Sequence, residues 1–199
     1  GALERHGGGV VALMWANNET GAVQPLHALG AALPPDSHLH CDGVQGVGKI
    51  PARVSDLGVD LFTFTGHKFS GPKGCGALYI RDGVELTPIS AGGKQEQGRR
   101  GGTENVAGIV GFGKACELAG GNLDGNSNHV RQLRERLLSQ LGDVSSVRIN
   151  GDVEHTVPHI ANVCLVYVDA LLLMLNLSQR KIFISVGSAC ASGKLEPSY

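Results

Sequence analysis

Short apolar segments alternate with polar, glycine-containing turns along this chain, and that alternation limits the fold more than any other feature. Apolar runs with β-branched residues at 10–15, 38–41 and 61–65 predict buried strands. Helical spacing of apolar residues predicts helices at 26–33 and 106–119. The 30 glycines are spread among the turns, as in α/β folds with tight connections. We therefore expect an α/β fold with a mostly parallel sheet.

The second half of the sequence predicts a separate unit. Residues 120–128 are poor in apolar side chains and rich in Gly and Asn, which is typical of a domain boundary. We therefore divide the chain into two domains, at 1–125 and 126–199. The remaining expected elements are strands at 77–81, 147–150, 160–166 and 182–186, and helices at 129–141 and 170–177.

The composition excludes several classes of function. A net charge of -1 and an aromatic content of 5% argue against a nucleic-acid partner. The longest apolar stretch, at 170–175, is far too short to cross a membrane, so no membrane partner is expected. The five cysteines are odd in number and form no CxxC pair, which favours a reducing compartment over a disulfide framework.

Polar residues follow three of the predicted strands: Asn18, Asp42 and Lys68. Ligands of open α/β sheets bind outside the carboxyl ends of the strands, so these side chains are candidates for one shared site. Lys68 is placed to form a Schiff base with an aldehyde cofactor, and Asp42 to keep a pyridine nitrogen protonated. The alternatives from local sequence are a solvated surface lysine and a turn or helix-cap aspartate.

Cys190 stands among small residues at 187–193, which indicates an exposed loop and a reactive thiol. The other four cysteines lie in strand, turn or helix patterns and are interpreted as small buried apolar residues. Alternation places His38, His40 and Asp42 on one face of a strand, but no second cluster with zinc spacing accompanies them, which argues against a metal site.

Five segments together resemble the NifS/IscS family of cysteine desulfurases, within the fold type I pyridoxal-phosphate enzymes. They are MWANNETG at 14–21, CDGVQ at 41–45, TGHK at 65–68, the stretch from GGKQE at 92–96 to GTEN at 102–105, and GSAC at 187–190 with LEPSY at 195–199. Their order and spacing match the family along nearly the whole chain. The resemblance implies that 1–125 is the second part of the large domain that binds pyridoxal phosphate, and that 126–199 is part of the small α+β C-terminal domain with the catalytic-cysteine loop. Gly43 and Gly101 stand where family members usually carry larger residues, and Lys94 interrupts a glycine-rich run.

The resemblance implies a role for each matching residue. Lys68 would carry the cofactor pyridoxal 5'-phosphate and move the α-proton of the substrate, and Cys190 would accept the sulfur of L-cysteine as a persulfide, with release of L-alanine. The sulfur would pass to an acceptor such as an iron–sulfur scaffold protein. The implied cofactor contacts are Asp42 with the pyridine nitrogen, Gln45 and Asn18 with the phenolic oxygen, Thr65 and His67 with the phosphate, and Thr103 with the phosphate of the neighbouring subunit of a homodimer.

Two alternatives stay open on the sequence. Selenocysteine lyases share several of these motifs, although the ending Glu-Pro-Ser-Tyr favours the desulfurases. The other alternative is an inactive truncated fragment or paralogue, because the chain lacks an initiating Met and ends inside a motif, and because the family is longer at both ends. The expected compartment is the cytoplasm or the mitochondrion, with the N-terminal segment missing.

Overall fold

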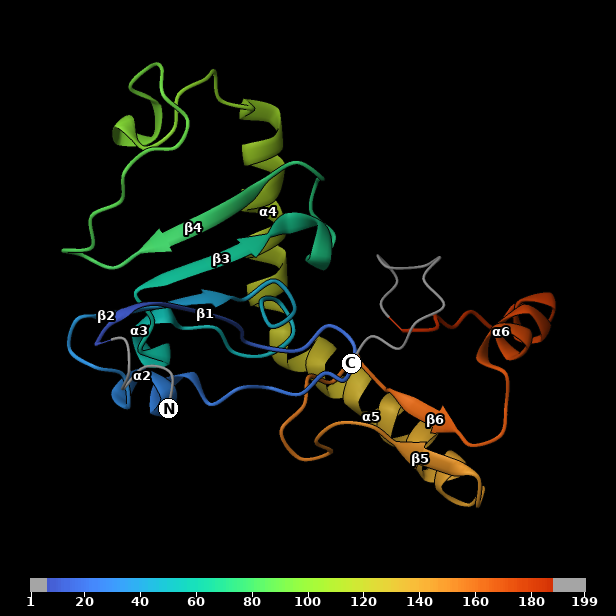
Figure 1. Cartoon of the computed structure of the whole chain (residues 1–199). Coiled ribbons are helices and arrows are strands. Elements are labelled where there is room, and N and C mark those ends of the chain that lie inside the picture. The colour runs from blue at the N-terminus through green and yellow to red at the C-terminus, as the bar shows by residue number, and fades with distance from the viewer. Residues whose placement is uncertain (1–6, 188–199) are drawn as a thin grey trace. The chain divides into compact units, whose positions relative to one another are not determined.

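The computed structural model describes residues 7–187, and these fall into two compact units (Figure 1). The first unit holds residues 7–16 and 24–126, and the second holds residues 17–23 and 127–187. The division lies at 126/127, inside helix α5 (Leu123–Gly142). The segment 120–128, expected at a domain boundary, is therefore mainly helical. The assignment of the two parts as large and small domains stays a prediction.

The first unit is built on a four-stranded sheet in the order β1-β2-β3-β4. Its strands are β1 (Gly9–Met14), β2 (Ser37–Asp42), β3 (Leu61–Thr65) and β4 (Gly76–Ile80). The pairs β1–β2 and β2–β3 are parallel, whereas β4 runs antiparallel to β3 with Thr65 opposite Gly76. The expected mostly parallel sheet is thus confirmed. Because β2 and β3 are parallel, Asp42 and Thr65 end their strands at the same edge.

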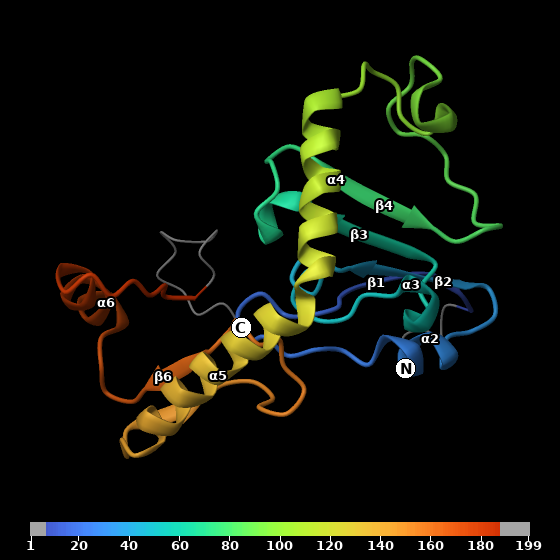
Figure 2. The ribbon, with the colours of Figure 1, turned by 180° about the vertical axis from the view of Figure 1, so that it is seen from behind.

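Aromatic side chains build much of the core beside this sheet. Phe62 is only 1% exposed, and its ring lies edge-on to Trp15 and tilted against Phe64. Phe64 and Phe69 both pack against Phe112 of α4 (Val106–Gly121). This helix crosses one face of β3 and β4, as Figure 2 shows from behind. Burying such rings is among the largest stabilising contributions available to a domain of this size.

The opposite edge of the sheet is fixed by a buried carboxylate. Asp60, directly before β3, is 5% exposed and accepts a hydrogen bond of 2.7 Å from the amide of Leu39. The guanidinium of Arg81, directly after β4, forms an ion pair with the same carboxylate. A buried charge is tolerated when it is paired in this way. Asp60 therefore joins β2, β3 and β4 at the edge away from Asp42 and Thr65.

Short helices connect the strands of the first unit. They are α2 (Leu26–Ala31), α3 (Val54–Leu57) and the 3-10 helices η1 (Gly66–Phe69) and η2 (Gln95–Gly98). The predicted helix at 26–33 is confirmed, ending before the pair Pro34-Pro35, which cannot continue it. The three other short helices were not predicted, since four residues are too few to show a helical period.

The second unit combines α5, a two-stranded antiparallel sheet and α6 (Ala170–Gln179). The strands are β5 (Val147–Ile149) and β6 (Val163–Leu165), and Leu138 of α5 and Val147 are buried. Asp169 caps α6 by accepting hydrogen bonds from the amides of Leu171 and Leu172. The predicted strand at 182–186 is wrong. Its β-branched residues adopt no strand because no neighbouring strand pairs with them in the described part of the chain.

Candidate functional site

Asp42, the last residue of β2, begins a tight turn at the carboxyl edge of the sheet. Its carboxylate Oδ1 accepts a hydrogen bond of 2.9 Å from the amide of Val44, an Asx-turn that directs the chain out of the strand. The amide of Gly43 binds the carbonyl of Thr63 on β3 at 2.8 Å. The following turn, which carries Gln45, is closed by backbone hydrogen bonds onto Gly43 and Gly46. Local hydrogen bonds thus fix Asp42 and Gln45 beside the end of β3.

Two glycines allow this turn to lie directly on the aromatic core. A Cβ atom added at Gly43 would stand 2.0 Å from Cζ of Phe62, and one added at Gly46 would stand 2.3 Å from Cε3 of Trp15. Real Cβ contacts do not approach so closely, so a larger residue at either position requires the ring to move. The absence of a larger side chain at Gly43, noted as a departure from the family, is explained by the Phe62 ring.

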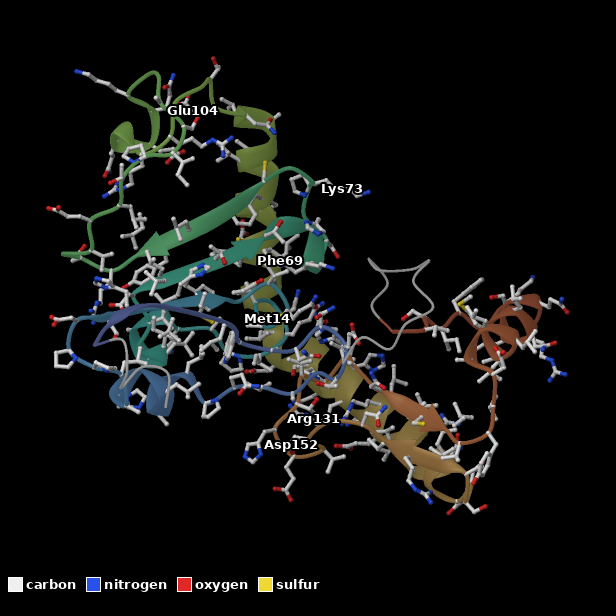
Figure 3. All side chains as sticks on the ribbon, in the orientation of Figure 1. Met14, Phe69, Lys73, Glu104, Arg131 and Asp152 are labelled. Atoms are coloured by element: carbon white, nitrogen blue, oxygen red, sulfur yellow. The ribbon has the colours of Figure 1, made fainter. Side chains whose placement is uncertain are left out.

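Thr65 ends β3, and η1 follows it at once with His67 and Lys68. The hydroxyl of Thr65 lies 3.0 Å from the carbonyl oxygen of Cys75 and 2.9 Å from Nδ1 of His67. Phe69 is buried and Ser70 ends the helix in the left-handed conformation at φ 69°. Phe69, labelled in Figure 3, anchors η1 so that His67 is exposed and Lys68 half-buried. Within the described residues, the Lys68 ammonium forms no ion pair or hydrogen bond, so it is available to a ligand.

The loop that carries Thr103 leads into α4. Thr103 is exposed, and Asn105 caps the helix by accepting a hydrogen bond of 3.1 Å from the amide of Gly108. The Asn105 amide also donates to the sulfur of Cys75 at 3.6 Å. Asn105 therefore ties the start of α4 to the residue whose carbonyl binds Thr65. Sequence reasoning missed this link, although an asparagine directly before an apolar helix is a recognisable N-cap signal.

Asn18 lies in the other unit. The chain leaves the first unit after Ala16, and residues 17–23 form a turn that belongs to the second unit. Within that unit, the amide of Asn162 donates to the carbonyl of Glu19 at 3.2 Å. The described units are not placed relative to each other, so the grouping of Asn18 with Asp42 and Lys68 stays a prediction. Cys190 lies outside the described residues, and its role stays a prediction as well.

The cysteines of the described part differ widely in environment. Cys41 is fully buried on β2, and desolvation, with the neighbouring charge of Asp42, raises its pKa to about 12. Burial also raises the pKa of the Cys116 thiol on α4. Cys164 on β6 is exposed, so its interpretation as a buried apolar residue is wrong; side chains alternate across a two-stranded sheet, and one face of this sheet is open.

Neither a metal cluster nor a membrane span is found in residues 7–187. No group of three or more His, Cys, Asp or Glu side chains there is arranged to hold a metal ion. His38 instead lies 3.9 Å from the buried carboxylate of Asp60, at the edge away from Asp42. No helix of this region is both long and apolar enough to cross a membrane.

The chain is similar to known proteins in both sequence and structure. The chain is 44% identical over 192 residues to a cysteine desulfurase of Gluconacetobacter diazotrophicus, covering 96% of this chain and 48% of that protein. The structure matches a NifS-like protein with a TM-score of 0.84 and 38% identity, covering 89% of this chain and 49% of that one. It also matches SspA in complex with cysteine with a TM-score of 0.69 and 33% identity, covering 91% and 50% of the two chains.

The chain spans about half the length of the curated relatives it matches. Nearly the whole chain nonetheless matches one protein family: the family model described as aminotransferase class-V aligns with residues 3–198. This range includes both units and all but the last residue of the sequence segments on which the resemblance was based. The chain therefore belongs to the class-V aminotransferase family.

Proposed function

We propose that the protein to which this chain belongs is a cysteine desulfurase that depends on pyridoxal 5'-phosphate. The observation that carries the proposal is the set of groups at one edge of the sheet. Asp42 ends β2, Thr65 ends the adjacent parallel strand β3, and His67 and Lys68 follow on η1. The similarity to proteins named cysteine desulfurase supports the reaction and the substrate.

The donor set fits the cofactor group by group. An amine at Lys68 suits an aldehyde, a carboxylate at Asp42 suits a protonated pyridine nitrogen, and the polar pair Thr65 and His67 suits a phosphate. Asp42 uses Oδ1 for the amide of Val44, and its carboxylate is in no ion pair within residues 7–187. Gln45 and Asn18 would contact the phenolic oxygen. When bound, the cofactor supplies an electron sink for the carbon from which a proton is removed.

The chain's own residues supply the remaining steps. The amine of Lys68 takes the α-proton of L-cysteine and returns a proton to the carbon skeleton. The Cys190 thiolate attacks the substrate sulfur, the carbon–sulfur bond breaks, and the carbon that loses sulfur is protonated. The products are L-alanine and a persulfide on Cys190, so atoms and electrons balance without an external oxidant. Persulfide formation requires an accessible thiolate, which Cys41, with its raised pKa and complete burial, does not offer.

The experiment adds pyridoxal phosphate to the purified chain and records its visible absorbance. We expect a cofactor band, and reduction with borohydride should leave the cofactor covalently attached to a peptide that contains Lys68. Lys68→Ala should abolish both. Lys73→Ala is the matched control, because Lys73 lies on the next turn with its side chain directed away from the sheet (Figure 3). Equal labelling of the parent and Lys68→Ala would refute the proposal.

Sulfur transfer is tested on the whole protein. We expect L-cysteine to yield one L-alanine per sulfur released and Cys190→Ser to stop the release. Faster turnover of selenocysteine than of cysteine would favour a selenocysteine lyase, and absence of any cofactor binding would favour an inactive fragment or paralogue.

The proposed partners follow from the same resemblance to cysteine desulfurases. A homodimer would let Thr103 reach the phosphate of the neighbouring subunit, and an iron–sulfur scaffold would accept the sulfur in the cytoplasm or mitochondrion. Analytical ultracentrifugation of the whole protein tests the dimer. Cofactor retention by Thr103→Ala, compared with that of the parent protein, tests the shared phosphate contact.

A further inference from the structure

Two long helices of the chain meet with a single residue between them (Figure 2). Helix α4 ends at Gly121, α5 begins at Leu123, and Asn122 leaves the helical conformation at φ -118° and ψ 15°. The amide of Asn122 donates to the carbonyl of Leu118 at 3.3 Å, and the amide of Asn126 donates to the carbonyl of Asn122 at 3.0 Å. Asn122 therefore divides what would otherwise be one continuous helix.

Three glycines lie at this junction although no packing contact requires them. Gly120 and Gly121 end α4, and Gly125 lies in the first turn of α5. A Cβ atom added to any of the three would meet no described heavy atom within 4 Å, and none of the three has a positive φ. Glycine is unfavourable inside a helix compared with alanine, because it loses more backbone entropy on folding. Neither close packing nor backbone geometry accounts for these glycines.

Two other glycines of α4 show the contrast. A Cβ atom added at Gly108 would collide with Sγ of Cys75, and one added at Gly111 would stand 3.2 Å from Cγ of Pro72. Both of these glycines lie where α4 packs against the turn before β4, so a larger residue would disturb that contact. The glycines at the junction have open surroundings instead.

The junction itself is hardly anchored by side chains. Residues 120–126 are exposed except for Leu123, which is half-buried. Before the junction, Ala115 of α4 is buried. After it, Arg134 of α5 donates to the carbonyl of Ile160 at 2.6 Å, and Leu138 is buried. The two helices are therefore held on either side of the junction rather than at it.

The junction also lies where the two compact units divide. The chain passes from one unit to the other at 126/127, directly after the junction, and at 16/17 and 23/24. The last two crossings are neighbours, because the amide of Gln24 donates to the carbonyl of Trp15 at 2.8 Å. Within residues 7–187, the units are thus joined by one narrow pair of segments and by the glycine-rich helix junction.

We propose that residues 120–125 form a flexible joint through which the second unit changes its orientation relative to the first. Glycines in open surroundings let the helical hydrogen bonds open locally while the anchored parts of α4 and α5 stay folded. A few residues at the end of an element are enough to absorb such a movement. The joint goes beyond the proposed function, because it requires neither the cofactor nor the substrate.

Hydrogen exchange of the whole protein, measured by mass spectrometry, tests the local opening. We expect the amides at 122–126 to exchange faster than those in the middle of α4 and of α5. Replacing all three glycines, with Gly120→Ala, Gly121→Ala and Gly125→Ala, should slow this exchange about tenfold or more, because each alanine favours the helix by a factor of about two to five.

Gly113→Ala is the matched control. Gly113 also lies in α4 with no described heavy atom within 4 Å of an added Cβ, but it stands two turns before the junction. Alanine at this position should stabilise α4 and leave the exchange at 122–126 unchanged.

Distances between two spin labels test the change of orientation. Labels attached to ketone-bearing amino acids at Glu117 and Arg136, which are both exposed, avoid the five cysteines of the chain. In protein diluted with unlabelled subunits, the parent should give a broad distance distribution. The triple alanine variant should narrow this distribution, and Gly113→Ala should leave it unchanged.

Each outcome supports or overturns the joint. Exchange at 122–126 that is no faster than in the helix centres, or a narrow distance distribution in the parent, overturns the proposal. Equal effects of Gly113→Ala and of the triple variant would also overturn it, because the response would then report helix stability in general. Should the triple variant fail to fold, Gly125→Ala alone decides: exchange slowed about two- to fivefold supports the joint, and unchanged exchange overturns it.

Discussion

Replacement of Gly43 by alanine should destabilise the first unit, because the Phe62 ring occupies the position of the new methyl group. The Cβ would stand 2.0 Å from Cζ of Phe62, whereas carbon atoms pack at about 3.5–4.0 Å. The ring would have to move by about 1.5 Å, the difference between these separations. It is 1% exposed and lies 5.9 Å from the ring of Trp15 and 6.1 Å from that of Phe64, so no free space receives it.

Overpacking of this kind lowers the free energy of unfolding by about 1–3 kcal/mol. Phe62→Leu shortens the side chain, so the loss caused by Gly43→Ala should fall to less than half in that background, with a coupling energy of about 0.5 kcal/mol or more. The chain contains one tryptophan, and Trp15 touches Phe62 edge-on, so urea unfolding followed by its fluorescence reports on this region.

Gly113→Ala is the matched control. Gly113 lies inside α4 and nothing stands within 4 Å of an added Cβ, so alanine should stabilise the helix by about 0.5–1 kcal/mol, a change of opposite sign. An unchanged urea midpoint for Gly43→Ala, or an equal loss with Phe62 and with leucine at position 62, would show that the ring does not set the space at Gly43.

Two further outcomes are expected from the ionisable groups. Iodoacetamide at pH 8 should label the exposed Cys164 and spare Cys41, as measured by mass spectrometry. Cys41 is spared because its pKa of about 12 leaves almost no thiolate at this pH. Rapid labelling of Cys41 in the native chain would contradict its burial. Backbone hydrogen bonds from His155 and Glu154 hold the pKa of Asp152 below its usual 3.8. The stability that the Asp152 carboxylate contributes is therefore fully present above pH 3.8. It is lost as the pH falls through the lower pKa that Asp152 has in the folded state. The difference in unfolding free energy between the parent chain and Asp152→Asn should therefore shrink in acid, and a constant difference from pH 7 to pH 2 would exclude this linkage.

Most elements of the fold could be predicted from local pattern because the pattern records which face is buried. Strand β3 was predicted at its observed bounds, and the strand segments at 10–15 and 38–41 were each placed within one residue at either end. The strand expected at 182–186 failed for the opposite reason. Its residues have β propensity, but a strand also needs a neighbouring strand to pair with. Five residues of sequence do not determine whether such a neighbour is available.

The same limit applies to the contacts within the site. A strand end that carries a lysine or an aspartate is visible in the sequence, and parallel pairing brings Asp42 and Thr65 to one edge. The carbonyl of Cys75 and the contact of Asn105 with the Cys75 sulfur are not visible in this way, because they depend on the antiparallel return of β4 and on the packing of α4. Local sequence therefore predicts candidate reactive groups but not the neighbours that orient them.

Asn18 shows what a correct local pattern leaves undetermined. The apolar run at 10–15 does form β1, and continuation along the same edge would place Asn18 beside Asp42. The backbone of residues 21–23 bonds to residues 155–157, through the Ala22–Thr156 bridge and the amides of Val23 and Val157. These partners are separated by more than a hundred residues, so their pairing depends on tertiary packing rather than on local propensity. Local propensity therefore does not reveal that residues 17–23 belong to the second unit, and the grouping of Asn18 with Asp42 stays a prediction.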